Sequence, residues 1–218
     1  IIAEAEAWAC ASGSNDLSAD GAGAGAGAGA RTAAAGEHGG KKKTRGWTTQ
    51  RHSSVPTTDL PLAELPGRAQ WLRRWLCTTL CPALKAAYPL DFDGKPSNMY
   101  LHDCFVVKYH AGQTVQVEGT SVSAVSAVTD GEQRHLPLHR DQSSHSFVLP
   151  LNNPSEFEGG GTYFSALGAV VKPSQGHLLA FRGSLLHAGE PVYNGTRYLL
   201  AGFLYLSRDD TYKSSSSS

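Results

Sequence analysis

The sequence has no net charge that would direct it toward a nucleic acid or an anionic membrane. Its 19 Lys and Arg residues balance 19 Asp and Glu residues in a chain of 218, and such a balance leaves no electrostatic footprint for a polyanion. The one basic cluster, at residues 41–45, is interpreted as part of a solvated linker. No apolar run reaches the roughly 18 residues that a membrane-spanning helix needs. We therefore expect no nucleic-acid partner and no membrane span in this sequence.

Cysteine is scarce, and its spacing excludes the common zinc motifs. The four cysteines, Cys10, Cys77, Cys81 and Cys104, form no C-x-x-C pair. Cys77 and Cys81 lie four residues apart in a helical pattern, which would stack them on one face of the helix. Buried free thiols are favoured over a disulfide, so cysteine usage does not fix the compartment.

Glycine and alanine dominate the first part of the chain. Residues 21–30 alternate Gly and Ala, and residues 31–40 continue with small and polar side chains. This composition buries too little apolar surface to offset the entropy lost on ordering. We therefore interpret residues 1–45 as a low-complexity tail or linker, residues 46–212 as the folded domain and residues 213–218 as a serine tail.

Within the folded part, one helix precedes many short strands. Apolar residues recur at spacings of three and four over residues 67–87, which predicts a helix whose two tryptophans pack in the core. Runs rich in β-formers predict strands near residues 104–109, 146–151, 163–164, 169–171, 177–181 and 198–206. The expected fold is mainly β: a double-stranded β-helix (jelly roll) with a supporting N-terminal helical segment. Residues 112–131 interrupt this pattern as a flexible insertion, either a mobile lid or a surface excursion.

A possible metal site lies in the strand region. His139 and Asp141 are two residues apart, and His187 follows 46 residues after Asp141. On extended backbone, residues two apart share a face, so His139 and Asp141 can reach one ion. A histidine from a later strand would complete a facial triad, which leaves coordination positions open for a co-substrate and O₂. A structural zinc site would instead close its coordination, usually with thiolates.

A basic residue that could bind a carboxylate follows His187 in the sequence. Arg197 lies ten positions after His187, at the start of a predicted strand, and its planar fork suits a carboxylate. The alternative is a surface arginine in a turn, because Asn194-Gly195 is itself a hairpin signal. Residues 159–161, Gly-Gly-Gly, allow a positive φ or a close backbone approach just before a strand.

These motifs, taken together and in order, resemble the 2-oxoglutarate-dependent procollagen lysyl hydroxylases and prolyl 4-hydroxylases. The resemblance covers about residues 104–206. The Glu-Gly-Gly-Gly run and the Gly-Thr-Arg-Tyr ending look most like the lysyl enzymes, whereas residues 107–113 look more like the prolyl enzymes. The matching segments are Glu132-Gln133, Leu136, His139-Arg140-Asp141, Ser144, Leu151-Asn152, residues 157–164, Pro173, Gly176, His187 and residues 195–198.

The resemblance implies a role for each matching position. His139, Asp141 and His187 would be the catalytic Fe(II) ligands. Arg197 would bind the distal carboxylate of 2-oxoglutarate, with help from Thr162 and Tyr109; an arginine here is the choice of the lysyl enzymes. Ascorbate would serve as a further cofactor. Phe203 would lie near the substrate. From their positions beside the metal pair in the sequence, Arg140 and His145 are also expected near the substrate.

The substrate stays open at this stage. The resemblance implies a peptide or protein substrate, hydroxylated on a prolyl or lysyl residue with release of succinate and CO₂, and it favours the secretory pathway. The alternatives are a hydroxylase of a free amino acid or other small molecule, and a metal-binding cupin-like β-barrel without catalysis. A nucleic-acid demethylase is disfavoured by the neutral charge. The oligomeric state is not indicated.

Overall fold

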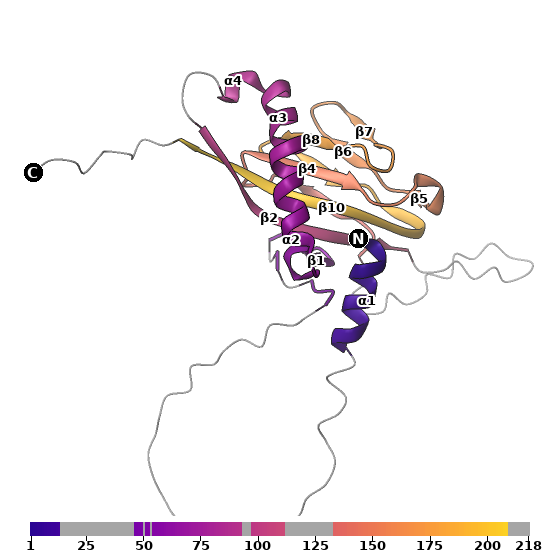
Figure 1. The fold of residues 1–218 in the computed structure, drawn as a ribbon. Helices are drawn as coiled ribbons and strands as arrows, with labels where there is room; N and C mark the ends of the chain where they lie inside the picture. The colour runs from indigo at the N-terminus through magenta and orange to yellow at the C-terminus, as the bar shows by residue number, and fades with distance from the viewer. Residues whose placement is uncertain (14–45, 50, 53, 93–96, 112–132, 209–218) are drawn as a thin grey trace, which may run out of the picture.

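Two antiparallel β-sheets form the centre of the molecule (Figure 1). The structure is a computed structural model, which describes residues 1–13, 46–49, 51–52, 54–92, 97–111 and 133–208. The larger sheet has the order β1-β2-β10-β4-β8, with β5 paired to β10, and the smaller has the order β3-β9-β6-β7. The strands are β1 (Asp59–Pro61), β2 (Ser97–His110), β3 (Leu136–His139), β4 (His145–Pro150), β5 (Phe157–Gly159), β6 (Thr162–Phe164), β7 (Ala169–Val171), β8 (Leu179–Arg182), β9 (His187–Gly189) and β10 (Val192–Arg208).

This architecture confirms the expected mainly β, jelly-roll fold. Each predicted strand is present, but β2 and β10 are much longer than predicted. They pair antiparallel along almost their full length and form the spine of the larger sheet, with an irregularity between Phe203 and Leu204. The pairing of two long strands is a tertiary contact, and for this reason the local sequence pattern does not show it.

The two faces of the larger sheet contribute to different core clusters. Alternate residues of a strand point to opposite faces. In β2, Cys104 and Val106 pack in one core cluster, whereas Phe105 and Val107 belong to the other. In β10, Leu200 joins the first cluster, and its odd-numbered neighbours face a pocket enclosed by the two sheets.

Helices cover the outer face of the larger sheet. A continuous helical stretch spans α2 (Arg68–Trp75), η3 (Leu76–Leu80, a π-helical turn) and α3 (Cys81–Ala87), as predicted for residues 67–87. The π turn ends two residues before Pro82, which has no N–H to donate and would break a regular helix. Trp71 and Trp75 stack and pack against the core, as expected. Three shorter helical segments are η2 (Leu62–Glu64), α4 (Pro89–Phe92) and η4 (Pro154–Glu156).

The first residues depart from the expected low-complexity tail. Residues Ile2–Gly13 form helix α1, and Ala5 is fully buried in the main core cluster. Glu6 accepts hydrogen bonds from Trp47, Lys108 and Tyr198. An isolated helix of this length is marginal in water, so docking onto the domain stabilises α1. The prediction of a tail was based on the Gly-Ala run. It did not include this short helix, which is rich in Ala and Glu.

Several further expectations concern other parts of the chain. The basic cluster at residues 41–45 and the insertion at residues 112–131 lie outside the described residues, and the domain limits of 46–212 stay a prediction. All four cysteines are free thiols; Cys104 is buried, but Cys10 and Cys77 are exposed, contrary to the expectation. In the described ranges, no helix combines the length and apolarity needed to cross a bilayer.

Candidate metal centre and pocket

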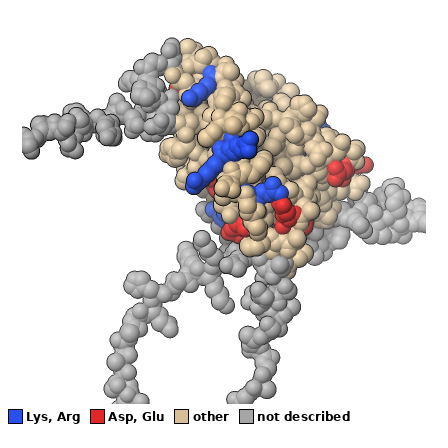
Figure 2. Space-filling model, in the orientation of Figure 1, with Lys and Arg blue, Asp and Glu red and all other residues tan. Residues whose placement is uncertain are grey.

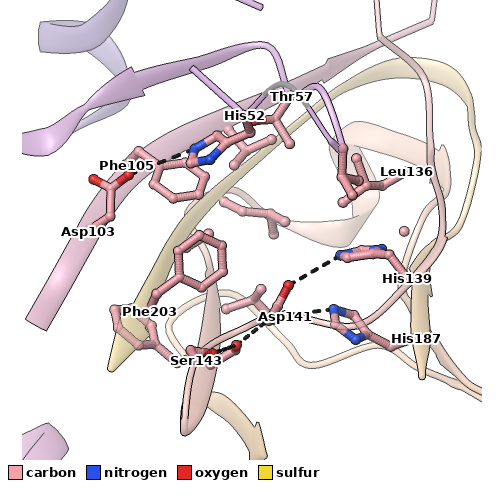
Figure 3. A pocket seen from close by; sticks show the side chains of 18 of the residues that line it. His52, Thr57, Asp103, Phe105, Leu136, His139, Asp141, Ser143, His187 and Phe203 are labelled. Carbon is pink, nitrogen blue, oxygen red and sulfur yellow. Dashed lines mark hydrogen bonds and ion pairs between the residues drawn. The ribbon is translucent and has the colours of Figure 1, made fainter. Parts of the chain in front are cut away.

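The register of β3 and β9 brings two histidines together. His139 ends β3 and His187 begins β9, and these two residues are direct partners in the antiparallel pair. Their ring centroids lie 4.3 Å apart. Asp141, two residues beyond β3, places Oδ1 3.4 Å from His139 Nε2 and Oδ2 3.6 Å from His187 Nε2. Figure 3 shows the three side chains pointing toward one another, and their ligand atoms all lie within 4.8 Å of each other.

Backbone carbonyls fix which nitrogen of each imidazole faces the centre. His139 Nδ1 donates to the Pro137 carbonyl at 2.7 Å, and His187 Nδ1 donates to the Leu185 carbonyl at 2.8 Å. Both Nε2 atoms are therefore unprotonated in the neutral rings and directed at Asp141. Metal-bound histidines are commonly oriented by such a hydrogen bond from the other ring nitrogen.

Asp141 is held as an ionised carboxylate. Burial would raise its pKa, but the adjacent imidazoles of His139 and His187 and the hydrogen bond from Ser146 outweigh burial, so the pKa is lowered. Burial lowers the pKa of His187, which favours the neutral imidazole. For His139, the Asp141 carboxylate and a backbone carbonyl outweigh burial and raise the pKa. Two imidazoles and one carboxylate, without a thiolate, form the donor set of a facial triad.

Arg197 lies in the interior rather than in a surface turn. Only 3% of the residue is exposed. Its Nη1 donates to the Gly161 carbonyl at 3.2 Å, and its guanidinium lies 5.7 Å from the ring centre of Tyr109, its partner across β2 and β10. Burial lowers the pKa of Arg197, and no carboxylate of the described residues forms an ion pair with it. A buried cation without a counter-charge is costly. An anion that binds beside Arg197 would offset this cost.

Tyr109 and Thr162, the two residues expected to help Arg197, lie in the same pocket as Arg197. Both are buried and line the same pocket as Arg197 and the triad. Burial raises the pKa of Tyr109 to about 12, so its hydroxyl stays protonated and can donate a hydrogen bond. Thr162 begins β6 and pairs with Gly189 of β9, two residues from His187.

The glycine run lets the backbone approach Arg197. All three glycines have positive φ, with Gly160 at 61°. A Cβ on Gly160 would lie 2.9 Å from Arg197 Cδ, closer than side-chain atoms tolerate. The prediction of positive φ at residues 159–161 is therefore confirmed, and the run belongs to the wall around the guanidinium.

One pocket of about 440 Å³ joins these groups. The triad, Arg197, Tyr109 and Thr162 all line it, as do Arg140 and Phe203, two of the three residues expected near the substrate. His145, the third, is not among the lining residues: it is 1% exposed, and its Nε2 pairs with Asp91 at 3.1 Å. Its ring packs on Tyr88. His145 precedes Ser146, and neighbours in a strand face opposite sides, so that expectation was wrong.

The pocket has a further group of lining residues that the sequence did not predict: Arg51, His52 and Asp103. Asp103 could have been found, because it lies two residues before Phe105 and four before Val107 on the pocket face of β2. Arg51 and His52 come from the irregular segment before β1, where no periodic pattern exists to place a side chain.

Comparison of the sequence with known proteins finds relatives that are named as hydroxylases. No protein-family model matches the chain. Over 118 residues (49% of this chain) it is 33% identical to procollagen-lysine,2-oxoglutarate 5-dioxygenase 2 of Homo sapiens. Over 157 residues (70% of this chain) it is 27% identical to the human multifunctional procollagen lysine hydroxylase and glycosyltransferase. The chain covers only 16% and 18% of these relatives.

A solved structure of an oxidoreductase of the 2OG-Fe(II) oxygenase family from Burkholderia pseudomallei is a more distant match. It covers 69% of this chain, and the chain covers 62% of it, with 14% identity and a TM-score of 0.44. The sequence matches agree with the resemblance drawn from the motifs: the chain is similar to procollagen lysine hydroxylases, one of which is named as a 2-oxoglutarate dioxygenase. Because the chain spans less than a fifth of those relatives, their activities and substrates do not transfer with the similarity.

Proposed function

We propose that this chain is a 2-oxoglutarate- and Fe(II)-dependent oxygenase that hydroxylates a C–H bond of a peptidyl prolyl or lysyl residue, with release of succinate and CO₂. One observation carries the proposal. A pocket contains the His139, Asp141 and His187 donor set and, in the same cavity, the buried guanidinium of Arg197, which has no counter-charge among the residues that the structure describes. A metal and a dicarboxylate would each complete one half of this arrangement.

The residues divide the work of binding. His139, Asp141 and His187 would hold Fe(II), which supplies the site of O₂ activation when it is bound. Arg197 would pair with the distal carboxylate of 2-oxoglutarate in a bidentate manner. Thr162 and Tyr109 can donate hydrogen bonds to that carboxylate. The buried setting excludes water and strengthens the electrostatic attraction between a guanidinium and a carboxylate.

Arg197 also argues against a non-catalytic cupin-like barrel. Such a protein needs metal ligands and a packed interior, but it has no need of a buried cation in the metal pocket. The free energy of burying an unpaired guanidinium is several kcal/mol, so a scaffold without an anionic ligand would do better with an apolar residue at this position.

The proposed peptide substrate is supported by the names of the relatives. The names of two of them state procollagen lysine hydroxylation, which supports a peptide substrate here, and ascorbate is included as the proposed reductant. A free amino acid would also fit a pocket of about 440 Å³.

Succinate formation tests the proposal. The protein is incubated with Fe(II), ascorbate and 2-oxoglutarate, with and without a panel of proline- and lysine-containing peptides. We expect succinate release that depends on Fe(II) and rises with one peptide class, and a gain of one oxygen in that peptide's mass. Absence of succinate under every condition, from protein shown to be folded, would overturn the proposal.

A further inference from the structure

A charged cluster lines the pocket across from the triad. Arg51 bridges two carboxylates: its Nη1 lies 2.5 Å from Asp59 Oδ1, and its Nη2 lies 2.6 Å from Asp103 Oδ2. His52 lies beside both, with Nε2 3.5 Å from Asp59 and 3.8 Å from Asp103. Figure 3 shows His52, Asp103 and Phe105 on the far side of the pocket from His139 and His187.

Arg51 acts inside the cluster, not on a ligand. Each of its terminal nitrogens is taken by one carboxylate, and its guanidinium lies 5.3 Å from the ring centre of Phe105. It is therefore poorly placed to bind an anionic group of a substrate. Its effect is to hold Asp103 in position and to fix the segment before β1 onto β2.

Asp103 is the carboxylate of this cluster that a ligand can reach. The Asp59 side chain is completely buried, whereas 22% of the Asp103 side chain is exposed. Asp103 Oδ1 accepts the Cys104 backbone N–H at 2.9 Å, and Oδ2 is bound by Arg51. A carboxylate offers about four acceptor positions, so acceptor capacity remains for a donor that enters the pocket.

Aromatic rings extend from Asp103 as an apolar surface. The ring of Phe105 lies 4.6 Å from that of His52 and 5.6 Å from that of Phe203, measured between centroids. His52 also meets Phe203 edge-on at 5.9 Å. All three rings line the pocket. They offer contact to an aliphatic stem, and their faces favour a cation at its end.

We propose that Asp103 is a specificity-determining residue, positioned by Arg51, which accepts a hydrogen bond from a substrate side chain made of an apolar stem and an amine end. This inference rests on the proposed function, and it separates the two substrate classes left open there. A prolyl ring has no amine for Asp103 to bind. A side chain that ends in an amine can contact both groups: its apolar stem would pack on Phe105 and Phe203, and its amine would donate to the Asp103 carboxylate.

The test compares two peptides that differ only at the amine. One carries lysine and the other norleucine, its uncharged counterpart with the same stem, and a third carries proline. Binding to the Fe(II)-loaded protein is measured by calorimetric titration, and turnover by peptide-dependent succinate release. We expect the lysine peptide to bind at least about tenfold more tightly than the norleucine peptide, since a charge-assisted hydrogen bond is worth about that factor.

Variants assign this preference to one carboxylate. Asp103→Asn should reduce the lysine preference to within about twofold, and the charge-retaining Asp103→Glu should keep part of it. Asp91→Asn is the matched control: its side chain is also 22% exposed and also pairs with an arginine and a histidine, but it does not line the pocket. The control should keep the full preference.

The outcomes separate this inference from the proposed function. Equal binding of lysine and norleucine peptides, tighter binding of the proline peptide, or an undiminished preference in Asp103→Asn would each overturn the role of Asp103, even if succinate is formed. Free lysine, titrated beside the peptide, distinguishes a small-molecule substrate from a peptidyl one that has the same chemistry. Amine-selective binding without any succinate would instead leave Asp103 in its role and overturn the oxygenase proposal.

Discussion

His139 and His187 are direct cross-strand partners, and their two rings lie 4.3 Å apart. The chain folds back between them, since His187 follows Asp141 by 46 positions in the sequence. Side chains opposite each other in an antiparallel pair are the closest neighbours that a sheet offers. The strand register thus fixes the positions of the two histidine ligands, and Asp141 is the second residue after the end of β3. Rigid elements of this kind hold a site more precisely than loops do.

Ser146 supports the metal ligand Asp141 from behind. Its hydroxyl donates to Asp141 Oδ2, and it also contacts Ser143 Oγ at 2.7 Å. Removal of such an outer hydrogen bond typically weakens metal affinity, so Ser146→Ala should raise the Fe(II) dissociation constant about tenfold. Ser155→Ala, at an exposed position, is the control. Unchanged iron affinity in Ser146→Ala would show that Asp141 is held by other contacts.

Arg197 should act on 2-oxoglutarate and not on iron. Arg197→Gln removes the charge but keeps a polar side chain of similar reach. Loss of a buried charged partner costs about 3 kcal/mol, so the apparent affinity for 2-oxoglutarate should fall about 100-fold. Iron binding should stay within about twofold of the wild type. Arg182→Gln, which alters an arginine that is half exposed and pairs with Asp91, is the control. A variant that loses iron and 2-oxoglutarate together would contradict this division.

Gly160 and Gly168 form a matched pair for testing the wall around Arg197. Both have a left-handed φ, of 61° and 58°, but a Cβ meets Arg197 only at Gly160 and finds nothing within 4 Å at Gly168. Either Gly→Ala change should lower the free energy of unfolding by about 1 kcal/mol through backbone strain. Only Gly160→Ala should also raise the KM for 2-oxoglutarate. Equal KM values in both variants would mean that the clash is absorbed without moving the guanidinium.

Helix α1 should contribute a pH-dependent part of the stability. Burial would raise the pKa of Glu6, but hydrogen bonds from Tyr198 and Lys108 outweigh burial and lower it. A carboxyl whose folded-state pKa is depressed stabilises the fold above its unfolded pKa of about 4.3 and loses that contribution as the pH falls through the folded value. Glu6→Gln should therefore lower the Tm at pH 7, with the difference from wild type shrinking below about pH 4. A difference that stays constant with pH would show that charge is not the cause.

The sequence predicts the parts of this molecule that depend on local pattern. Periodicities of two and 3.6 locate the strands and the helix over residues 67–87, and the H-x-D spacing with His187 and Arg197 locates the centre of the pocket. The same alternation, applied to β4, should have turned His145 away from the pocket, because its neighbour Ser146 contacts Asp141.

Other features follow from contacts between distant segments, and no local pattern announces them. Helix α1 is stabilised by Trp47, Lys108 and Tyr198, up to 192 residues away from Glu6. Arg51 reaches the pocket because Asp59 and Asp103 bind it from two strands of the larger sheet. Electrostatic partners that meet only in the folded chain cannot be chosen from the many Asp and Arg residues of the sequence alone.

The most direct test counts the iron atoms held by the chain under anaerobic equilibrium dialysis, in wild type, Asp141→Ala and His187→Ala. We expect one Fe(II) per wild-type chain, and loss of specific binding in both variants while each keeps the fold, as judged by circular dichroism. Undiminished stoichiometric binding in both variants would place the metal elsewhere and contradict the account of the site.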